Sequence, residues 1–361
     1  MKAAIISLGS KSSEMIAEAM KKYFSEVDML NLKEIEVRLG KEGGIFYQGK
    51  KLSHYDCVYL KGSFRYVNLL AAVAALLERK TAYLPLSSSS YLNVHNKVLT
   101  HLLLEQENIP MPKTYLTSTI IAAKELIKKV HYPIVMKFPE GTQGKGVMFA
   151  DSISSASSLL DALGALNQPF LIQEYIETDG TDIRALVVGE KVVAAMRRKA
   201  QREEKRANIH AGGSGKEIKL SPEQVKVAVD TARILGADVC GVDILESPLG
   251  PLVIEANISP GLQGISKVVS VDIADEIAKF FYQKTEEAVQ KNKKVENEKA
   301  MKDLALEKSI GTENPQEIIT ALIFRGEKII LPEIVARITK FNERKEFILK
   351  IKKGKVEIEE H

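Results

Sequence analysis

Residues 241–261 constrain the fold of this chain more than any other segment. Two runs rich in Val, Ile and Leu flank the turn sequence Ser-Pro-Leu-Gly, a pattern typical of a β-hairpin. Glu255 and Asn257 are two residues apart, so a strand directs both side chains to one face. With a three-residue loop at 248–250, Asp243 would pair with Glu255 and join that face. The sequence therefore predicts three oxygen ligands at one place in an apolar hairpin.

Such a set of ligands suits a hard divalent cation. Mg²⁺ is commonly bound by one or two carboxylates together with substrate phosphates, and Mn²⁺ accepts the same oxygen ligands. A solvated polar face would leave the same residues in the sequence. However, the neighbouring residues are apolar, and a buried carboxylate without a partner is costly. We therefore interpret Asp243, Glu255 and Asn257 as a site for Mg²⁺ or Mn²⁺.

Composition narrows the class of protein. A chain of 361 residues should form two or three domains with a substantial core. Its net charge of +4 does not argue for nucleic acid, and no apolar run approaches the roughly 20 residues of a membrane span. Cys57 and Cys240 lie in apolar runs and read as buried, reduced thiols. The apolar stretch at the N-terminus is too short for a signal peptide, so we expect a cytoplasmic protein.

The pattern along the chain predicts alternating strands and helices up to residue 85, which indicates a small parallel α/β domain. Here we expect strands at 3–8, 27–32 and 56–60 and helices at 13–24 and 69–78. Further on we expect helices at 97–107 and 119–130, strands at 132–138, 170–176, 182–188 and 192–198, and a helix opened by Ser221-Pro222. Residues 284–312 are rich in Lys and Glu and read as a helical tether, followed by alternating runs typical of a small antiparallel β module.

Two lysines and a glycine-rich loop suggest phosphate binding. Lys137 ends a predicted strand just before the loop Glu-Gly-Thr-Gln-Gly-Lys-Gly at 140–146. Glycines let backbone N–H groups approach phosphate oxygens, and a nearby lysine supplies charge. Glycine-rich hairpin loops are common, however, and this one matches no Walker pattern. Lys97, at the start of a predicted helix, would in isolation be a solvated lysine.

A second polar group precedes a Gly-Gly turn and comprises Arg197, Arg198, Arg206, Asn208 and His210. Arginines bind phosphate and carboxylate through paired hydrogen bonds, so the group could neutralise a polyphosphate or a carboxylate. An exposed basic loop is the alternative. His210 is more commonly a hydrogen-bonding loop residue than a catalytic base.

Taken in order, these segments resemble the ATP-grasp carboxylate–amine ligases and, within them, the RimK-like α-L-glutamate ligases. The resemblance covers about residues 1–285. Its motifs are Asn96-Lys97, Val135-Met-Lys137, the loop 140–146, Gln173-Glu-Tyr-Ile176, Asp182-Ile-Arg184, Arg206-Ala-Asn208, Gly241-Val-Asp243 and Glu255-Ala-Asn257-Ile-Ser-Pro-Gly261.

The resemblance implies an α/β fold, with α+β grasp lobes, and the following division of the chain. The domains would be a parallel α/β pre-ATP-grasp domain at 1–88, a central grasp lobe at 89–170, a C-terminal grasp lobe with the metal site at 171–285, a charged helical tether at 286–313 and a small β module at 314–361.

The resemblance also implies a reaction and the residues that serve it. ATP would phosphorylate a carboxylate, and an amine, expected to be that of L-glutamate, would attack the acyl phosphate to give an amide, ADP and phosphate. Arg206 and Asn208 would be catalytic, facing the transferring phosphoryl group. The ATP contacts would be Lys97, Lys137, Gly141, Thr142, Gln143, Gly144, Gly146, Gln173, Glu174, Tyr175, Ile176, Asp182 and Arg198. The cofactors would be ATP and Mg²⁺ or Mn²⁺.

The identity of the acceptor stays open, because two positions depart from the family pattern. Ala211 and Lys61 stand where the family commonly has arginine, and both positions are where an acceptor carboxylate would be expected. A protein C-terminus, an amino-group carrier protein or a glutamate-bearing coenzyme would each fit. A nucleotide-binding scaffold without turnover is the alternative from another class. The β module could recruit a protein partner or pack on a neighbouring subunit, so we expect a homo-oligomer.

Overall fold

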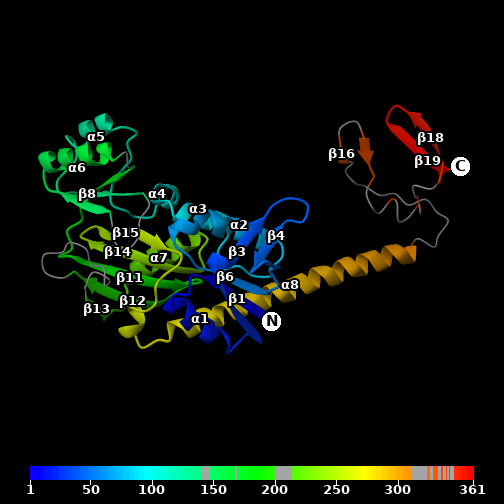
Figure 1. The fold of residues 1–361 in the computed structure, drawn as a ribbon, viewed down its shortest axis with the longest axis horizontal. Coiled ribbons are helices and arrows are strands. Elements are labelled where there is room, and N and C mark those ends of the chain that lie inside the picture. The colour runs from blue at the N-terminus through cyan, green and yellow to red at the C-terminus, as the bar shows by residue number, and fades with distance from the viewer. Residues whose placement is uncertain are drawn as a thin grey trace. The chain divides into compact units, whose positions relative to one another are not determined.

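The computed structural model describes residues 1–139, 146–166, 169–200, 214–309, 323–325, 328–331 and 345–361, together with residues 335, 339 and 341. Two compact units are present, Met1–Lys291 and Asn292–His361 (Figure 1), and each is treated by itself. The first unit contains three layers of sheet, and the predicted functional residues all fall within its span of the chain.

The N-terminal layer is a parallel sheet in the order β2–β1–β6, beside a small antiparallel sheet β3–β4–β5. Its elements are β1 (Lys2–Ser7), β2 (Glu26–Asn31), β3 (Ile35–Arg38), β4 (Gly44–Tyr47), β5 (Lys50–Lys51), β6 (Cys57–Leu60), α1 (Lys11–Met20), α2 (Val67–Leu77), α3 (Ser88–Val94), and the short helical turns Leu32–Glu34 and Phe64–Tyr66. Strand β1 is an almost continuous apolar run and is buried on both faces, as parallel strands usually are. Helix α1 begins at Lys11, because the Ser10 side chain accepts the backbone N–H of Ser13 and caps it; our boundaries of 13–24 were wrong.

A four-stranded sheet, β7–β10–β8–β9, forms a lobe with its own core. Its elements are α4 (Lys97–Gln106), which precedes the sheet, β7 (Thr114–Tyr115), α5 (Ile120–Leu126), β8 (Ile134–Lys137), β9 (Val147–Ala150), α6 (Ile153–Ala165) and β10 (Leu171–Glu174). Helices α5 and α6 lie together over this sheet (Figure 1). Ile134, Met136, Leu160 and Ile172 are buried between the sheet and the helices. The separate core makes the lobe a structural entity distinct from the rest of the unit.

The third layer is an antiparallel five-stranded sheet in the order β13–β12–β11–β14–β15. Its elements are β11 (Thr181–Val188), β12 (Lys191–Lys199), β13 (Ser214–Glu217), α7 (Pro222–Ile234), β14 (Val239–Ser247), β15 (Gly250–Asn257) and the helical turn Ile265–Lys267. Helix α7 begins with a capping box in which Ser221 and Gln224 satisfy each other's backbone N–H groups. It contacts strands β11, β12, β14 and β15. Along each strand, alternate side chains face α7, and the side chains between them face a cleft on the opposite side of the sheet.

The β14–β15 hairpin reaches the expected pairing by a different route. Ser247 pairs with Gly250, so the loop has two residues rather than the three that we expected. A register shift next to Asp243 restores the alignment, and Asp243 pairs with Glu255 while Gly241 pairs with Asn257. A β-bulge of this kind inserts one extra residue and re-aims the side chains beside it. Asp243, Glu255 and Asn257 therefore share one face of the sheet, as the alternation predicts.

Helix α8 (Ile273–Ser309) is a single element that begins in the first unit and continues into the second. Its first turns are anchored by Phe281, which is fully buried and lies edge-on to Tyr59 at 4.9 Å between ring centroids. Among the described residues, no helix is both long enough and apolar enough to cross a bilayer. The second unit also contains two antiparallel hairpins, formed by β16 (Ile323–Arg325), β17 (Lys328–Ile330), β18 (Phe347–Lys352) and β19 (Lys355–Glu360).

Candidate active site

A cleft of about 590 Å³ in the first unit is lined by residues from all three layers. Every predicted site residue that the structure describes lines it. These are Lys97, Lys137, Gly146, Gln173, Glu174, Tyr175, Ile176, Asp182, Arg198, Asp243, Glu255 and Asn257. The remaining predicted residues lie outside the described part of the chain, namely Gly141, Thr142, Gln143, Gly144, Arg206 and Asn208, as do His210 and Ala211. Segments up to 160 residues apart in sequence thus meet at one place.

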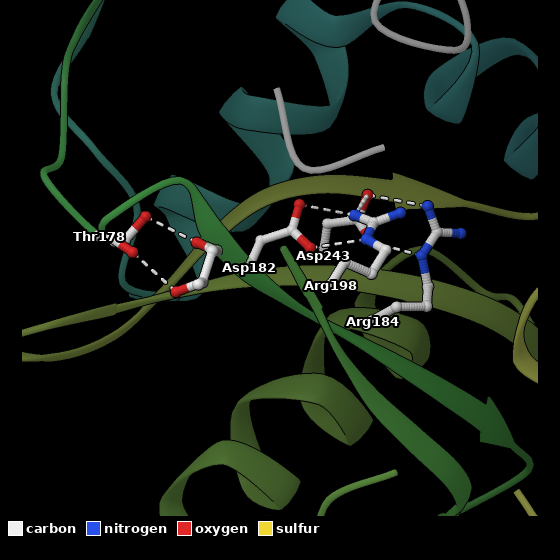
Figure 2. A network of polar contacts seen from close by, with 6 residues as sticks. Thr178, Asp182, Arg184, Arg198 and Asp243 are labelled. Carbon is white, nitrogen blue, oxygen red and sulfur yellow. Dashed lines mark hydrogen bonds and ion pairs between the residues drawn. The ribbon is translucent and has the colours of Figure 1, made fainter. Parts of the chain in front are cut away.

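The floor of the cleft is the face of the five-stranded sheet that points away from α7. Strand pairing places Asp182 opposite Arg198, and Arg184 opposite Asp243. Arg198 donates two hydrogen bonds to the Asp182 carboxylate, at 2.6 and 2.7 Å, and its Nη2 lies 2.9 Å from Oδ2 of Asp243. Arg184 contacts both oxygens of Asp243, with Nη2 at 2.8 Å from Oδ2 (Figure 2). Two carboxylates and two guanidinium groups form one buried network.

Of the two adjacent arginines on β12, Arg198 faces the cleft and belongs to this network, whereas Arg197 does not. Burial raises the pKa of Asp182, and the adjacent Arg198 opposes that rise. Arg197, the next residue along β12, points to the other side of the sheet and pairs with Glu246 at 2.6 Å near the surface. Because consecutive strand residues face opposite ways, our grouping of Arg197 with Arg198 in one anion-binding cluster was wrong.

The candidate metal ligands Asp243, Glu255 and Asn257 come from strands β14 and β15. Asp243 is buried, at 4% exposure, whereas Glu255 and Asn257 are partly exposed to the cleft. The Oδ1 atom of Asn257 accepts the backbone N–H of Ser259 at 2.9 Å, which fixes the orientation of its amide. Within the described residues, no group of three or more His, Cys, Asp and Glu could hold a metal. Two carboxylates and one amide fit a Mg²⁺ ion that takes its other ligands from phosphate and water.

Lys137 projects from the end of β8 and is held by Gln173 on the neighbouring strand. Its Nζ donates to Oε1 of Gln173 at 2.7 Å, and Nε2 of Gln173 lies 2.7 Å from Oγ1 of Thr114 and 3.3 Å from Nε2 of His101. Burial lowers the pKa of Lys137 to about 8, with a further decrease from the charge of Lys97, while Glu255 and Asp243 act in the opposite direction. Gln173 therefore fixes the position of the Lys137 side chain. The sequence did not reveal Thr114 and His101, because they belong to separate elements.

Lys97 and an aromatic pair occupy other parts of the cleft wall. Lys97 is the first residue of α4, whose preceding residue Asn96 caps the helix by accepting the N–H groups of residues 98 and 99. The backbone N–H of Lys97 donates to the carbonyl of Pro139 at 3.4 Å, next to the glycine-rich loop. Phe149 and Tyr175 meet edge to face at 5.9 Å and line the cleft.

The N-terminal domain contributes Lys61, which is buried at 5% exposure and lines the cleft. Its Nζ donates to the carbonyl of Pro260 at 3.2 Å, and burial lowers its pKa to about 8. Ser12 on α1 accepts the backbone N–H of Leu262 at 2.9 Å. The segment that follows the candidate metal ligands is thus fixed by two residues from a different layer.

A cleft between a lobe with its own antiparallel sheet and a second antiparallel sheet that carries carboxylates is the arrangement of the ATP-grasp fold. A family profile for the RimK-like ATP-grasp domain matches residues 94–281. A protein of Cellvibrio japonicus (strain Ueda107) named "Probable alpha-L-glutamate ligase" is 37% identical over 285 residues, which are 78% of this chain and 95% of that protein. A protein of Aeromonas salmonicida (strain A449) with the same name is 38% identical over 301 residues, 82% of this chain and 100% of that one.

Solved structures share the fold at lower identity. The ATP-grasp ligase PsnB, complexed with a phosphomimetic variant of its minimal precursor, Mg and ADP, superposes with a TM-score of 0.62 at 18% identity, covering 79% of this chain and 98% of PsnB. The macrocyclase MdnC of Microcystis aeruginosa MRC, bound with precursor peptide MdnA, gives a TM-score of 0.59 at 15% identity, covering 78% and 100%. The chain belongs to the RimK-like ATP-grasp family, and it is an ATP-dependent carboxylate–amine ligase.

Proposed function

We propose that this protein joins L-glutamate to a carboxylate acceptor, with ATP converted to ADP and phosphate through an acyl-phosphate intermediate. The choice of glutamate is supported by the names of the relatives at 37% and 38% identity. The intermediate is the chemistry that the cleft can serve without a nucleophilic side chain. In such a reaction positioning and charge neutralisation account for the rate, and effective molarity alone supplies about 7–11 kcal/mol.

The observation that carries the proposal is the register of the β14–β15 hairpin. It sets Asp243 opposite Glu255, with Asn257 two residues further on, in a cleft that also holds Lys97 and Lys137. These three oxygen donors would hold the Mg²⁺ of a magnesium nucleotide. When bound there, the cation would neutralise charge on the phosphate oxygens.

The chain's own residues would orient the nucleotide around that point. Lys137, fixed by Gln173, would bring a buried positive charge to the phosphates, where a charge-assisted hydrogen bond contributes about 1.5–3 kcal/mol. Phe149 and Tyr175 would offer an apolar wall for the adenine ring. Arg206 and Asn208 remain our predicted contacts to the transferring phosphoryl group. Enclosure of the cleft by three layers would protect an acyl phosphate from water.

The acceptor would be a carboxylate at the end of a peptide or carrier protein. PsnB and MdnC are both bound with precursor peptides, which supports a peptide acceptor for this fold. Lys61 would suit a carboxylate, because it is a buried cation that lines the same cleft and, among the described residues, donates its hydrogen bond to a backbone carbonyl and not to a carboxylate.

The proposal is tested with the purified full-length chain, ATP, Mg²⁺, a panel of amino acids and a panel of carboxylate acceptors, including peptides with C-terminal glutamate. We expect ADP release that depends on both substrates, and a product heavier than the acceptor by one glutamate residue. Glu255→Gln should remove both signals, whereas Arg197→Gln, on the opposite face of the sheet, should retain them. Tight ATP binding without amide formation across the panel would instead identify a nucleotide-binding scaffold.

A further inference from the structure

Arg184 is held in the cleft by the same carboxylate that we assign to the metal. Within the described residues, its side-chain polar contacts are to the two oxygens of Asp243. Its own strand position explains this, because Arg184 pairs directly across from Asp243 in the sheet. Figure 2 shows its guanidinium facing the Asp243 carboxylate. A cation that bound Asp243 would therefore compete with Arg184 for those oxygens.

Arg198, the other guanidinium in the network, is fixed more firmly. It makes two hydrogen bonds to Asp182 as well as its contact to Asp243, and its side chain is 7% exposed. Arg184 has no such second carboxylate among the described residues, and its side chain is 17% exposed. Loss of the Asp243 contact would thus release Arg184 and leave Arg198 in place.

The charges of the network explain why an arginine is needed there. Asp182 and Asp243 carry two negative charges, which Arg184 and Arg198 balance. Without Arg184, the two buried carboxylates would share the single positive charge of Arg198, which leaves one negative charge unbalanced and is unfavourable in a buried site. A divalent cation at Asp243 would supply the missing charge. The network therefore has two alternative ways to neutralise the same carboxylate.

We propose that Arg184 occupies the cation's place on Asp243 in the nucleotide-free protein and leaves it when the magnesium nucleotide binds. This inference rests on the proposed function, since it takes Asp243 to be a metal ligand. The released guanidinium lines the cleft, where its donors suit phosphate oxygens. Metal binding is consequently weak until a nucleotide binds, because the nucleotide phosphates both add ligands to the metal and give Arg184 a new partner. Arg184 is thus a positioning residue that couples metal binding to nucleotide binding.

The test measures Mn²⁺ binding to the full-length chain without nucleotide, from the loss of the electron paramagnetic resonance signal of free Mn²⁺. We expect Arg184→Gln to bind Mn²⁺ about tenfold more tightly than the wild type, equivalent to about 1.4 kcal/mol. Arg184→Lys retains a cation and should stay near the wild type. Arg197→Gln removes an arginine from the opposite face of the same sheet and should have no effect. A thermal melt should show that Mn²⁺ restores more stability to Arg184→Gln than to the wild type.

The possible results separate the two claims. If Arg184→Gln lowers the melting temperature and Mn²⁺ affinity is unchanged or weaker, Arg184 is only a structural partner of Asp243 and this inference is overturned. Asp243→Asn in the Arg184→Gln background should abolish the added Mn²⁺ affinity. If that double variant binds Mn²⁺ as well as Arg184→Gln does, the metal does not bind at Asp243, and the metal assignment of the proposed function fails instead.

Discussion

The lowered pKa of Lys137 makes nucleotide affinity depend on pH in a predictable direction. Burial sets the pKa of this lysine at about 8 in the free protein, and only its protonated form supplies charge to a phosphate. The apparent dissociation constant equals the intrinsic value divided by the competent fraction. That fraction is about 0.9 at pH 7 and about 0.09 at pH 9. We therefore expect the affinity for a non-hydrolysable ATP analogue to fall about tenfold between these pH values.

Isothermal titration calorimetry at half-unit steps of pH measures this dependence. Phosphate groups, with a second pKa of about 6, are already ionised over the range and contribute little to the slope. Lys137→Met should bind weakly at pH 7 and lose the slope. Lys61→Met is the matched control and should keep the slope, since Lys61 has a similarly lowered pKa but belongs to the N-terminal domain and donates to the carbonyl of Pro260. A Lys137→Met variant that keeps the wild-type slope would refute the reasoning.

Three further outcomes follow from the structure. Glu255→Gln should reduce ADP formation at least 100-fold, as measured by a coupled ADP assay, and near-normal turnover would remove Glu255 from the metal site. Its melting temperature, measured by calorimetry, should stay within a few degrees of the wild type, because a partly exposed carboxylate is replaced by an isostere. Truncation after Lys291, where the two compact units divide, should leave nucleotide affinity unchanged in calorimetry but alter acceptor use, or the oligomeric state measured by light scattering. Loss of nucleotide binding would show that the second unit belongs to the catalytic core. Phe281→Ala should destabilise the first unit by about 3–5 kcal/mol, measured by urea unfolding, because it empties the space beside Tyr59; a cost below about 1 kcal/mol would mean that α8 is not anchored there.

The family and the fold were predictable because the informative signals are local. Alternation within one strand placed Glu255 and Asn257 on one face, and the comparisons confirm the RimK-like ATP-grasp family. The roles of the individual site residues remain predictions. The three-residue loop that we used to pair Asp243 with Glu255 was wrong, because the structure reaches this pairing through a two-residue loop and a β-bulge. A bulge leaves no sequence signal as clear as that of a turn.

The network around Asp243 could not be predicted, because it depends on pairing between distant strands. Arg184 and Asp243 are 59 residues apart, and only the register of β11 against β14 brings them together. Likewise, the register of β11 against β12 decides that Arg198, not Arg197, shares the cleft with Asp182. A one-residue slip in either pairing would turn every side chain to the opposite face. The i, i+2 spacing of Asp182 and Arg184 was the available signal that both face one way.

The most direct test of the central claim is a crystal structure of the full-length chain with a non-hydrolysable ATP analogue and Mn²⁺, read by the anomalous scattering of manganese. The account predicts an anomalous peak bounded by Asp243, Glu255 and Asn257, with the nucleotide phosphates completing the ligands and the Arg184 guanidinium moved off Asp243. A peak elsewhere, or a nucleotide bound outside the cleft that Lys137 lines, would contradict it.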